Sequence, residues 1–312
     1  MIELIRNTNI DFMGKRKFAL AFSVVVSLIG IFALVQIGLG NANLGVDFAG
    51  GTAVQVKFAQ SVPLQQVRTA LEQGGLRDFD LQDLPTENKV LVRVKKQDEQ
   101  LGGASEKITQ ILTQRFADKQ PVIDSTTEIG PKVGSRLRQD ALKAILVSVA
   151  GILLYIAWRF QFRFGIGATV ATFHDVLAVL AIFFLLGKEI NLILLSALLT
   201  IAGYSLTDTV VIFDRIRENL KRFANSREDT NSIINRSINE VLSRTIVTAL
   251  TTLLAALALF LFGGEVLHDF ALAMILGIVI GTYSSVFVAS PVVVLLGNKK
   301  NAGQTAAAGS RS

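Results

Sequence analysis

The chain has 312 residues, of which 51% are hydrophobic and only 18% are charged. Soluble domains carry roughly 25% charged residues, and the mean hydropathy here is +0.49, so composition indicates an integral membrane protein. There are no cysteines and only two histidines, His174 and His268. This excludes a disulfide framework and a thiolate metal site, and it argues against a zinc or iron site. The net charge of +6 is typical of cytoplasmic connections rather than of a nucleic-acid surface.

Six apolar stretches are long enough to cross a bilayer as helices, which takes about 20 residues each. In chain order they are residues 18–37, 142–158, 164–186, 192–213, 245–262 and 270–296. A cleaved signal peptide is the alternative for the first stretch. Its apolar run is long and no small-residue cleavage site follows it, so we expect a membrane span.

Lysine and arginine are concentrated in alternate connections. They follow the second, fourth and sixth spans, at Arg159, Arg163, Arg215, Arg217, Lys221, Arg222, Arg227, Arg236, Arg244, Lys299 and Lys300, whereas the opposing short connections hold only Lys188. The positive-inside rule therefore places both termini in the cytoplasm. Residues 1–17 and the loop 214–244 would be cytoplasmic, with 297–312 as a disordered cytoplasmic tail. Residues 38–141 would form an extracytoplasmic domain.

That outer segment reads as a small α+β domain. Period-2 alternation predicts strands at 52–58, 79–84, 89–95 and 122–129, and helical spacing predicts helices at 63–73 and 106–116. The order strand, helix, strand, strand, helix, strand is that of a ferredoxin-like fold. The segment holds no catalytic constellation, so we interpret it as a compact binding or spacer domain.

A glycine-rich motif, Gly-Val-Asp-Phe-Ala-Gly-Gly, follows the first span. Its glycines Gly45, Gly50 and Gly51 surround Asp47 and predict a turn. A phosphate-binding loop would need a following helix and usually a lysine, whereas a strand is predicted here. We therefore treat the motif as structural.

The fourth span carries one carboxylate, Asp208, about 9 Å deeper in the helix than Asp214, because six residues separate them. A charged side chain at that depth costs roughly 2.5–3.5 kcal/mol on insertion scales, and such residues are functional-site hypotheses by default. The alternative is a polar residue that only bonds a neighbouring helix. We expect Asp208 to exchange protons during a conformational cycle.

Two other groups are candidates for the same proton relay. Arg244, at the start of the fifth span, is a candidate partner for Asp208, or else a cytoplasmic arginine that anchors its helix. On the same helix, hydroxyls that bond across helices or line a wet path are supplied by Thr245, Thr248, Thr251 and Thr252. His174 and Asp175, in the middle of the third span, are either a second relay pair or a mutually satisfied polar pair. Asp214 and Arg215 stand at the cytoplasmic exit, where we expect ion pairs that anchor helices.

Four segments together carry a resemblance to a known family. They are the glycine motif at 45–51, Phe-His-Asp at 173–175, the long run Gly-Tyr-Ser-Leu-Thr-Asp-Thr-Val-Val-Ile-Phe-Asp-Arg-Ile-Arg-Glu-Asn at 203–219, and Ser-Arg-Thr at 243–245. With the span count and single outer domain, nearly the whole chain resembles the SecF branch of the SecD/SecF family, which is related to RND transporters. Thr207 departs from the pattern, because the family more commonly has Asn there.

The resemblance implies an accessory subunit of the bacterial Sec translocase, in the cytoplasmic membrane, that uses the proton-motive force to complete polypeptide export. Its implied partners are SecD, the SecYEG channel, YajC, the exported unfolded polypeptide and the lipid bilayer, with no nucleic acid and no cofactor. Asp208 would take up protons and Arg244 would tune its charge. The alternatives are half of an RND-type efflux pump and a non-transporting scaffold. An enzyme is the least favoured reading, because no nucleophile–base pair or metal set is present.

Overall fold

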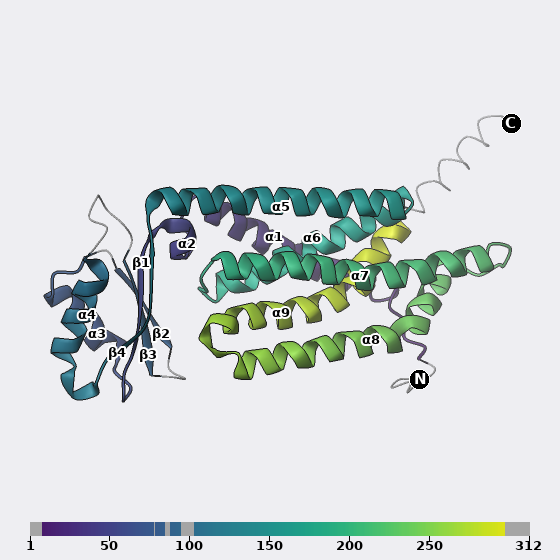
Figure 1. The fold of residues 1–312 in the computed structure, drawn as a ribbon. Helices are drawn as coiled ribbons and strands as arrows, with labels where there is room; N and C mark the ends of the chain where they lie inside the picture. Colours follow the sequence, from purple (N-terminus) through teal and green to yellow (C-terminus); the bar gives the residue numbers. More distant parts are fainter. Residues whose placement is uncertain (1–7, 78, 85–87, 95–102, 297–312) are drawn as a thin grey trace. The chain divides into compact units, whose positions relative to one another are not determined.

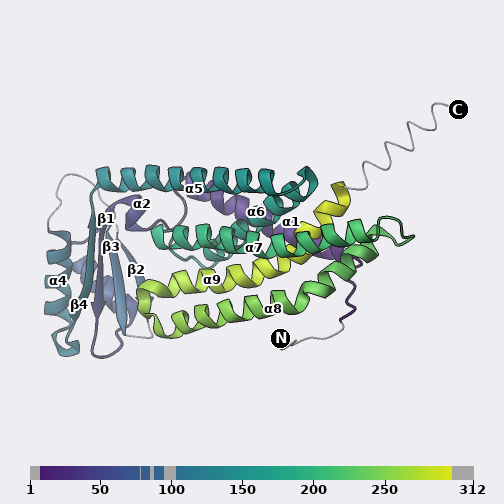
Figure 2. The ribbon, with the colours of Figure 1, turned by 45° about the vertical axis from the view of Figure 1, so that its right-hand side comes forward.

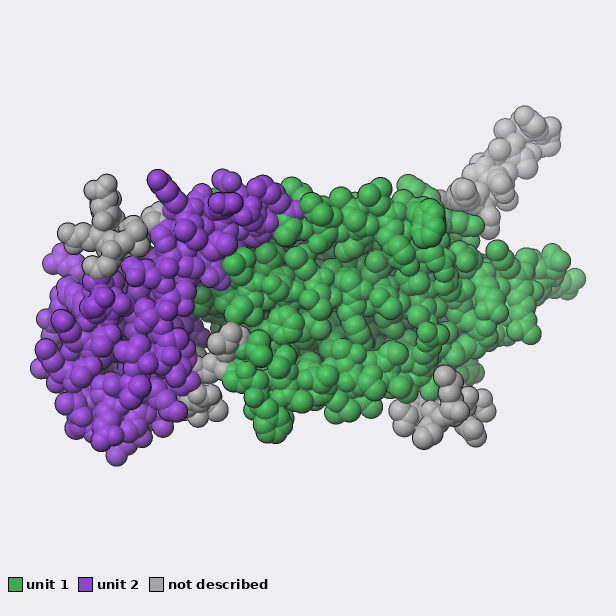
Figure 3. All heavy atoms as spheres, in the orientation of Figure 1, with its two compact units in different colours: residues 1–43, 144–312 green, residues 44–143 purple. Residues whose placement is uncertain are grey.

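The computed structural model describes residues 8–77, 79–84, 88–94 and 103–296 (Figure 1). These form two compact units, one of residues 1–43 with 144–312 and the other of residues 44–143 (Figure 3). The second unit corresponds to the outer segment expected at 38–141. The tail expected to be disordered, 297–312, lies outside the described residues, as do Lys95, Lys299 and Lys300.

The first unit is built from long helices. They are α1 (Arg16–Gly38), α5 (Pro131–Arg159, which starts in the second unit), α6 (Phe162–Leu185), α7 (Leu192–Arg222), α8 (Thr230–Phe262) and α9 (Gly264–Ser284), followed by the π-helical segment η3 (Ser285–Ala289). Six helices in the described part of the chain are long and apolar enough to cross a membrane. The predicted helical membrane fold is confirmed.

Several helices extend beyond the apolar stretches that revealed them. Helix α8 begins at Thr230 and α7 continues to Arg222, so most of the predicted loop 214–244 is helical and only residues 223–229 connect the two helices. The side chain of Asp229 accepts a hydrogen bond from the Asn231 backbone N–H, 3.2 Å away, and caps α8. Hydropathy marks the part of a helix that suits lipid, whereas caps and tertiary packing set where the helix ends.

Helices α6 and α9 occupy the interior of this unit, and both views show α7, α8 and α9 side by side (Figures 1 and 2). Close approach depends on glycine. A Cβ placed on Gly30 of α1 would lie 2.4 Å from the carbonyl oxygen of Leu177 on α6. The outer helices α1 and α5 instead expose large apolar side chains, such as Phe18, Phe22 and Leu154, as lipid-facing helices do.

The second unit contains, in order, α2 (Val46–Ala49), β1 (Gly51–Lys57), α3 (Leu64–Gln73), β2 (Phe79–Leu84), β3 (Lys89–Val94), α4 (Ala104–Arg115), the 3₁₀ turn η2 (Ala117–Lys119) and β4 (Val122–Ile129). The sheet order is β2-β3-β1-β4, with every neighbouring pair antiparallel. This is the ferredoxin-like arrangement predicted from the order of elements.

The alternation in β1 and β3 gives this sheet one apolar face. Val54 pairs with Val92 in the antiparallel register, and both side chains are buried. They pack in one cluster with Val67 and Leu71 of α3 and with Leu112 of α4, the two helices that lie on one side of the sheet (Figure 1). The helices thereby close the core of this unit.

The glycine motif forms the entry to this sheet. The carbonyl of Gly45 accepts hydrogen bonds from the backbone N–H groups of Phe48 and Ala49, at 3.0 and 2.8 Å, and this turn is helix α2. Gly50 and Gly51 follow with φ values of 73° and 128°, a region that disfavours residues with a Cβ. The pair connects α2 to β1, and the structural role of the motif stays a prediction.

Candidate functional site

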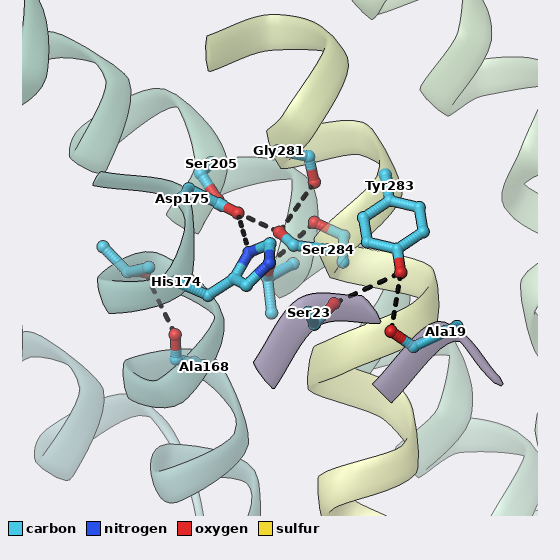
Figure 4. A network of polar contacts seen from close by, with 12 residues as sticks. Ala19, Ser23, Ala168, His174, Asp175, Ser205, Gly281, Tyr283 and Ser284 are labelled. Atoms are coloured by element: carbon cyan, nitrogen blue, oxygen red, sulfur yellow. Dashed lines mark hydrogen bonds and ion pairs between the residues drawn. The ribbon is translucent and has the colours of Figure 1, made fainter. Parts of the chain in front are cut away.

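A polar cluster lies where α6, α7 and α9 meet, centred on Asp175 (Figure 4). The Asp175 side chain is completely buried. Its Oδ1 lies 2.9 Å from His174 Nδ1, and its Oδ2 accepts hydrogen bonds from the hydroxyls of Ser284, at 2.7 Å, and Ser205. The Asp175 carboxylate of α6 is therefore hydrogen-bonded to both α7 and α9.

Small residues on α9 bring the helices close enough for these bonds. A Cβ on Gly281 would lie 3.3 Å from the Cβ of Ser205 and 3.7 Å from Asp175 Oδ2. One turn earlier, a Cβ on Gly277 would lie 2.4 Å from Cγ1 of Ile201. Glycines four residues apart share one helix face, which permits close packing between helices in membranes.

Asp208 lies one turn beyond Ser205 on α7, so the two residues share a helix face. Its side chain is half-buried. The hydroxyls of Thr245 on α8 and Ser285 in η3 lie beside the carboxylate, and the charge of Asp175 is close enough to act on it. Yet among the described residues Asp208 Oδ2 and Thr245 Oγ1 are buried polar atoms that complete no hydrogen bond.

The π-helical segment η3 begins at Ser285, directly after Ser284 at the end of α9. Ser284 donates to Asp175, and its neighbour Ser285 lies beside Asp208 and is 2.9 Å from the hydroxyl of Thr209. Segments of π-helix occur frequently at functional sites. Two consecutive serines thus lie next to the two carboxylates, Ser284 next to Asp175 and Ser285 next to Asp208.

On its other side the cluster extends to α1. Tyr283 donates a hydrogen bond of 2.9 Å to the carbonyl oxygen of Ala19, and its hydroxyl lies 3.2 Å from that of Ser23 (Figure 4). The ring of Tyr283 is 6.3 Å from that of His174, centroid to centroid. The Nε2 atom of His174 is buried and has no hydrogen-bond partner among the described residues.

Arg244 has an exposed side chain on α8, and no ion pair joins it to Asp208 in the part of the chain that the structure describes. Its neighbour Thr245 is the residue that lies beside the carboxylate. The partnership of Arg244 with Asp208 therefore stays a prediction.

Asp214 and Arg215 make ion pairs between helices at the end of α7. Asp214 bonds to Arg159 of α5, and Arg215 pairs with Glu240 of α8, with 2.5 Å between Nε and Oε2. Ion pairs were expected here, and their role as helix anchors stays a prediction. The glycine motif, with Gly45, Asp47, Gly50 and Gly51, belongs to the other unit.

Sequence reasoning did not single out Ser205, Ser284 and Ser285. All three are fully buried, but buried serine is common in membrane helices and carries no distinct signal in one sequence. The sequence pointed to the polar cluster only through titratable residues, which are rare in membrane spans. These are His174, Asp175 and Asp208.

Comparison with known proteins adds an independent finding. Residues 108–299 match the family model described as "Protein export membrane protein SecD/SecF, C-terminal", and residues 42–62 match the "SecD/SecF GG Motif". The second match covers the glycine motif and strand β1. The first covers most of the spans and both carboxylates of the cluster.

Curated relatives match along almost the whole chain. The protein translocase subunit SecF of Thermodesulfovibrio yellowstonii is 63% identical over 95% of this chain and 98% of its own length. That of Calditerrivibrio nitroreducens is 41% identical over 95% of this chain and 97% of its own length.

Among solved structures, the chain is similar to SecDF, a translocon-associated membrane protein from a Thermus species. The TM-score is 0.82 and the identity 35%, over 94% of this chain but only 39% of the SecDF chain. This chain therefore spans about two fifths of that larger protein.

Proposed function

This chain belongs to the SecD/SecF family of protein export membrane proteins, as a SecF-type member, and from that premise we propose that it helps to complete polypeptide export by using the proton-motive force. In this proposal it sits in the bacterial cytoplasmic membrane with both termini inside. SecD supplies the other half of the machine, and the assembly acts on an unfolded polypeptide at the SecYEG channel, with YajC as a further partner.

The observation that carries the proposal is Asp208. Its carboxylate is half-buried in an apolar helix, and its Oδ2 completes no hydrogen bond with any described residue. A carboxyl group there changes the charge inside the bilayer when it gains or loses a proton. Moving one charge through 100 mV is worth about 2.3 kcal/mol, so two or more protons supply a driving force for a conformational cycle.

Coupling requires that the two conformations differ in their preference for protonated Asp208. The surroundings of Asp208 support this requirement, because they come from three elements, α7, α8 and η3. A shift of any one of them changes which hydroxyls face the carboxylate. Arg244 would tune the charge at this place in a conformation in which its side chain turns inward.

Half of an RND-type efflux pump is the alternative from the same superfamily. Such pumps carry two large outer domains, one in each half. Here α8 ends at Phe262 and α9 begins at Gly264, which leaves no room for a domain between them. The solved SecDF chain that this chain matches over 39% of its length favours a SecD-like partner half instead.

The test is export by inverted vesicles that contain this chain, a SecD-like partner and the channel. Asp208→Asn removes the titratable group and keeps the shape. We expect export to fall to the rate that wild-type vesicles show with an ionophore. Thr207→Val is the matched control, because its hydroxyl donates only to the carbonyl of Gly203 on its own helix. Wild-type rates with Asp208→Asn would refute proton coupling and support the scaffold alternative.

A further inference from the structure

Asp175 is the most thoroughly buried carboxylate of the polar cluster, and the proton cycle proposed for Asp208 leaves it without a role. It lies at 0% exposure and touches groups of three helices, His174 on its own helix, Ser205 on α7 and Ser284 on α9. An ionised carboxylate only accepts hydrogen bonds, and all three of these neighbours can donate. The arrangement therefore fits the charged form.

Adding a proton to Asp175 would change this arrangement. A proton on Oδ2 turns that oxygen into a donor with less capacity to accept, so one of the two serine hydroxyls on Oδ2 then turns elsewhere. Ser284 has a second acceptor ready, because its Oγ lies 2.7 Å from Asp175 Oδ2 and 3.1 Å from the carbonyl oxygen of Gly281. A hydroxyl has one hydrogen and donates to one of these two acceptors at a time.

We propose that Asp175 is a second protonation site of the cycle, and that its charged form locks α6 to α7 and α9 through Ser205 and Ser284. This inference rests on the function proposed above. Protonation forms one O–H bond at Oδ2 of Asp175, and the proton comes from the aqueous phase and returns to it. Ser284 then donates to Gly281 within α9, and the charge-assisted hydrogen bond from α9 to the Asp175 carboxylate is lost.

The position of Asp208 links the two sites. Asp208 shares a face of α7 with Ser205, one turn away, and Ser285, beside Asp208, is the chain neighbour of Ser284. Like charges oppose each other in a medium of low dielectric. A change of charge at Asp208 is therefore felt at Asp175, which is the group that holds the helices together.

Three other titratable groups lie around Asp175 among the residues that the structure describes. They are His174 on α6, Asp208 on α7 and, beside the ring of His174, Tyr283 on α9. Tyr283 is contacted by two residues of α1, Ala19 and Ser23, and both are uncharged. Variants of Asp175 and Asp208, made separately and together, distinguish the two carboxylates from the histidine.

The first experiment is the vesicle export assay with Asp175→Asn, which fixes a neutral side chain of the same shape. We expect export to lose its dependence on the proton-motive force, and the double variant with Asp208→Asn to be no slower than either single variant. Thr172→Val is the matched control on α6, since its buried hydroxyl donates only to the carbonyl of Ala168, 3.0 Å away. If Asp208→Asn loses coupling while Asp175→Asn exports at the wild-type rate, this inference fails alone.

A second measurement separates a protonation site from a merely structural one. The chain has no cysteine, so spin labels can be attached at Val170→Cys on α6 and Val279→Cys on α9, both exposed positions. In the complex with the SecD-like partner, the distance between the labels should change as the pH is lowered. In Asp175→Asn the distance should stay constant over the same range. A pH response that persists in Asp175→Asn would overturn the proposal.

Should Asp175→Asn fail to assemble, Ser284→Ala provides the same test. It keeps the carboxylate and removes one of the two donors to Oδ2, so the pH at which the label distance changes should shift from the wild-type value. An unchanged midpoint would overturn the lock, because in the lock Ser284 donates to the charged form of Asp175.

Discussion

The contact between Gly277 on α9 and Ile201 on α7 gives the sharpest test of the packing, and we expect Gly277→Ala to destabilise the protein. The added methyl would lie 2.4, 2.5 and 2.9 Å from Cγ1, Cδ1 and Cγ2 of Ile201. Both branches of the isoleucine are contacted, so rotation about χ1 does not clear the clash. Ile201 is itself only 1% exposed, so the side chains packed around it leave it no space into which it could move.

Overpacking of this kind costs about 1–3 kcal/mol, and the contact with both branches places Gly277→Ala at the upper end. Gly281→Ala is the matched comparison on the same helix face. Its methyl would meet Ser205 Cβ at 3.3 Å, which a shift of a few tenths of an ångström relieves. We expect a loss of less than about 1 kcal/mol there, because alanine also favours the helix by about that amount.

The assay is the free energy of unfolding in detergent, measured for the two alanine variants and for a double-mutant cycle. Ile201→Ala removes all three clashing atoms, and alone it should cost about 2–5 kcal/mol through the cavity it leaves. Combined with Gly277→Ala, the loss should be smaller than the sum of the two by about 1–3 kcal/mol. Strict additivity, or a Gly277→Ala variant as stable as the wild type, would refute the close approach of α7 and α9.

Two further predictions concern the segment that precedes α1. Asn235 of α8 accepts hydrogen bonds from the backbone N–H groups of Phe12 and Met13, at 3.1 and 2.9 Å, and donates to Asp11 at 2.7 Å. Asn235→Ala should therefore weaken the docking of this segment on α8 by about 2–3 kcal/mol, at about 1 kcal/mol for each hydrogen bond. Hydrogen exchange of the Phe12 and Met13 N–H groups should become faster. An unchanged exchange rate would contradict the contact. The backbone N–H of Gly14, followed by the Asn235 amide, holds the pKa of Asp11 below its ordinary value of 3.8. Because the folded pKa is the lower one, the contribution of Asp11 is present above pH 3.8 and is lost as the pH falls through the folded value, so docking followed by hydrogen exchange should be constant near neutrality and weaken only in acid.

Much of the architecture can be predicted from local sequence patterns. The alternation of Val90, Val92 and Val94 and the helical spacing of Val67 and Leu71 depend only on the geometry of a strand and a helix. They predicted the strand and helix order of the outer domain, and the antiparallel sheet follows that order. The long apolar stretches predicted the spans for an equally local reason, since a bilayer selects length and hydrophobicity.

The ends of the helices were harder to predict from the sequence. Residues 230–244 are polar enough to read as a loop, yet they form the first turns of α8. Tertiary contacts sustain them, among them the ion pair of Arg215 with Glu240 and the hydrogen bonds of Asn235 and Asn239 to the segment before α1. Such contacts join residues that lie far apart in the chain.

The residue order alone places carboxylates inside the membrane spans, because Asp175 and Asp208 are conspicuous in apolar helices. It did not determine which groups surround them. Arg244 stays the predicted partner of Asp208, and its neighbour Thr245, one of the hydroxyls noted on the same helix, is the residue that lies beside the carboxylate. Neighbouring residues on a helix point about 100° apart, so the rotation of α8 against α7 decides between them. That rotation, and with it the placement of Ser205, Ser284 and Ser285, is fixed only by the tertiary packing of the helices.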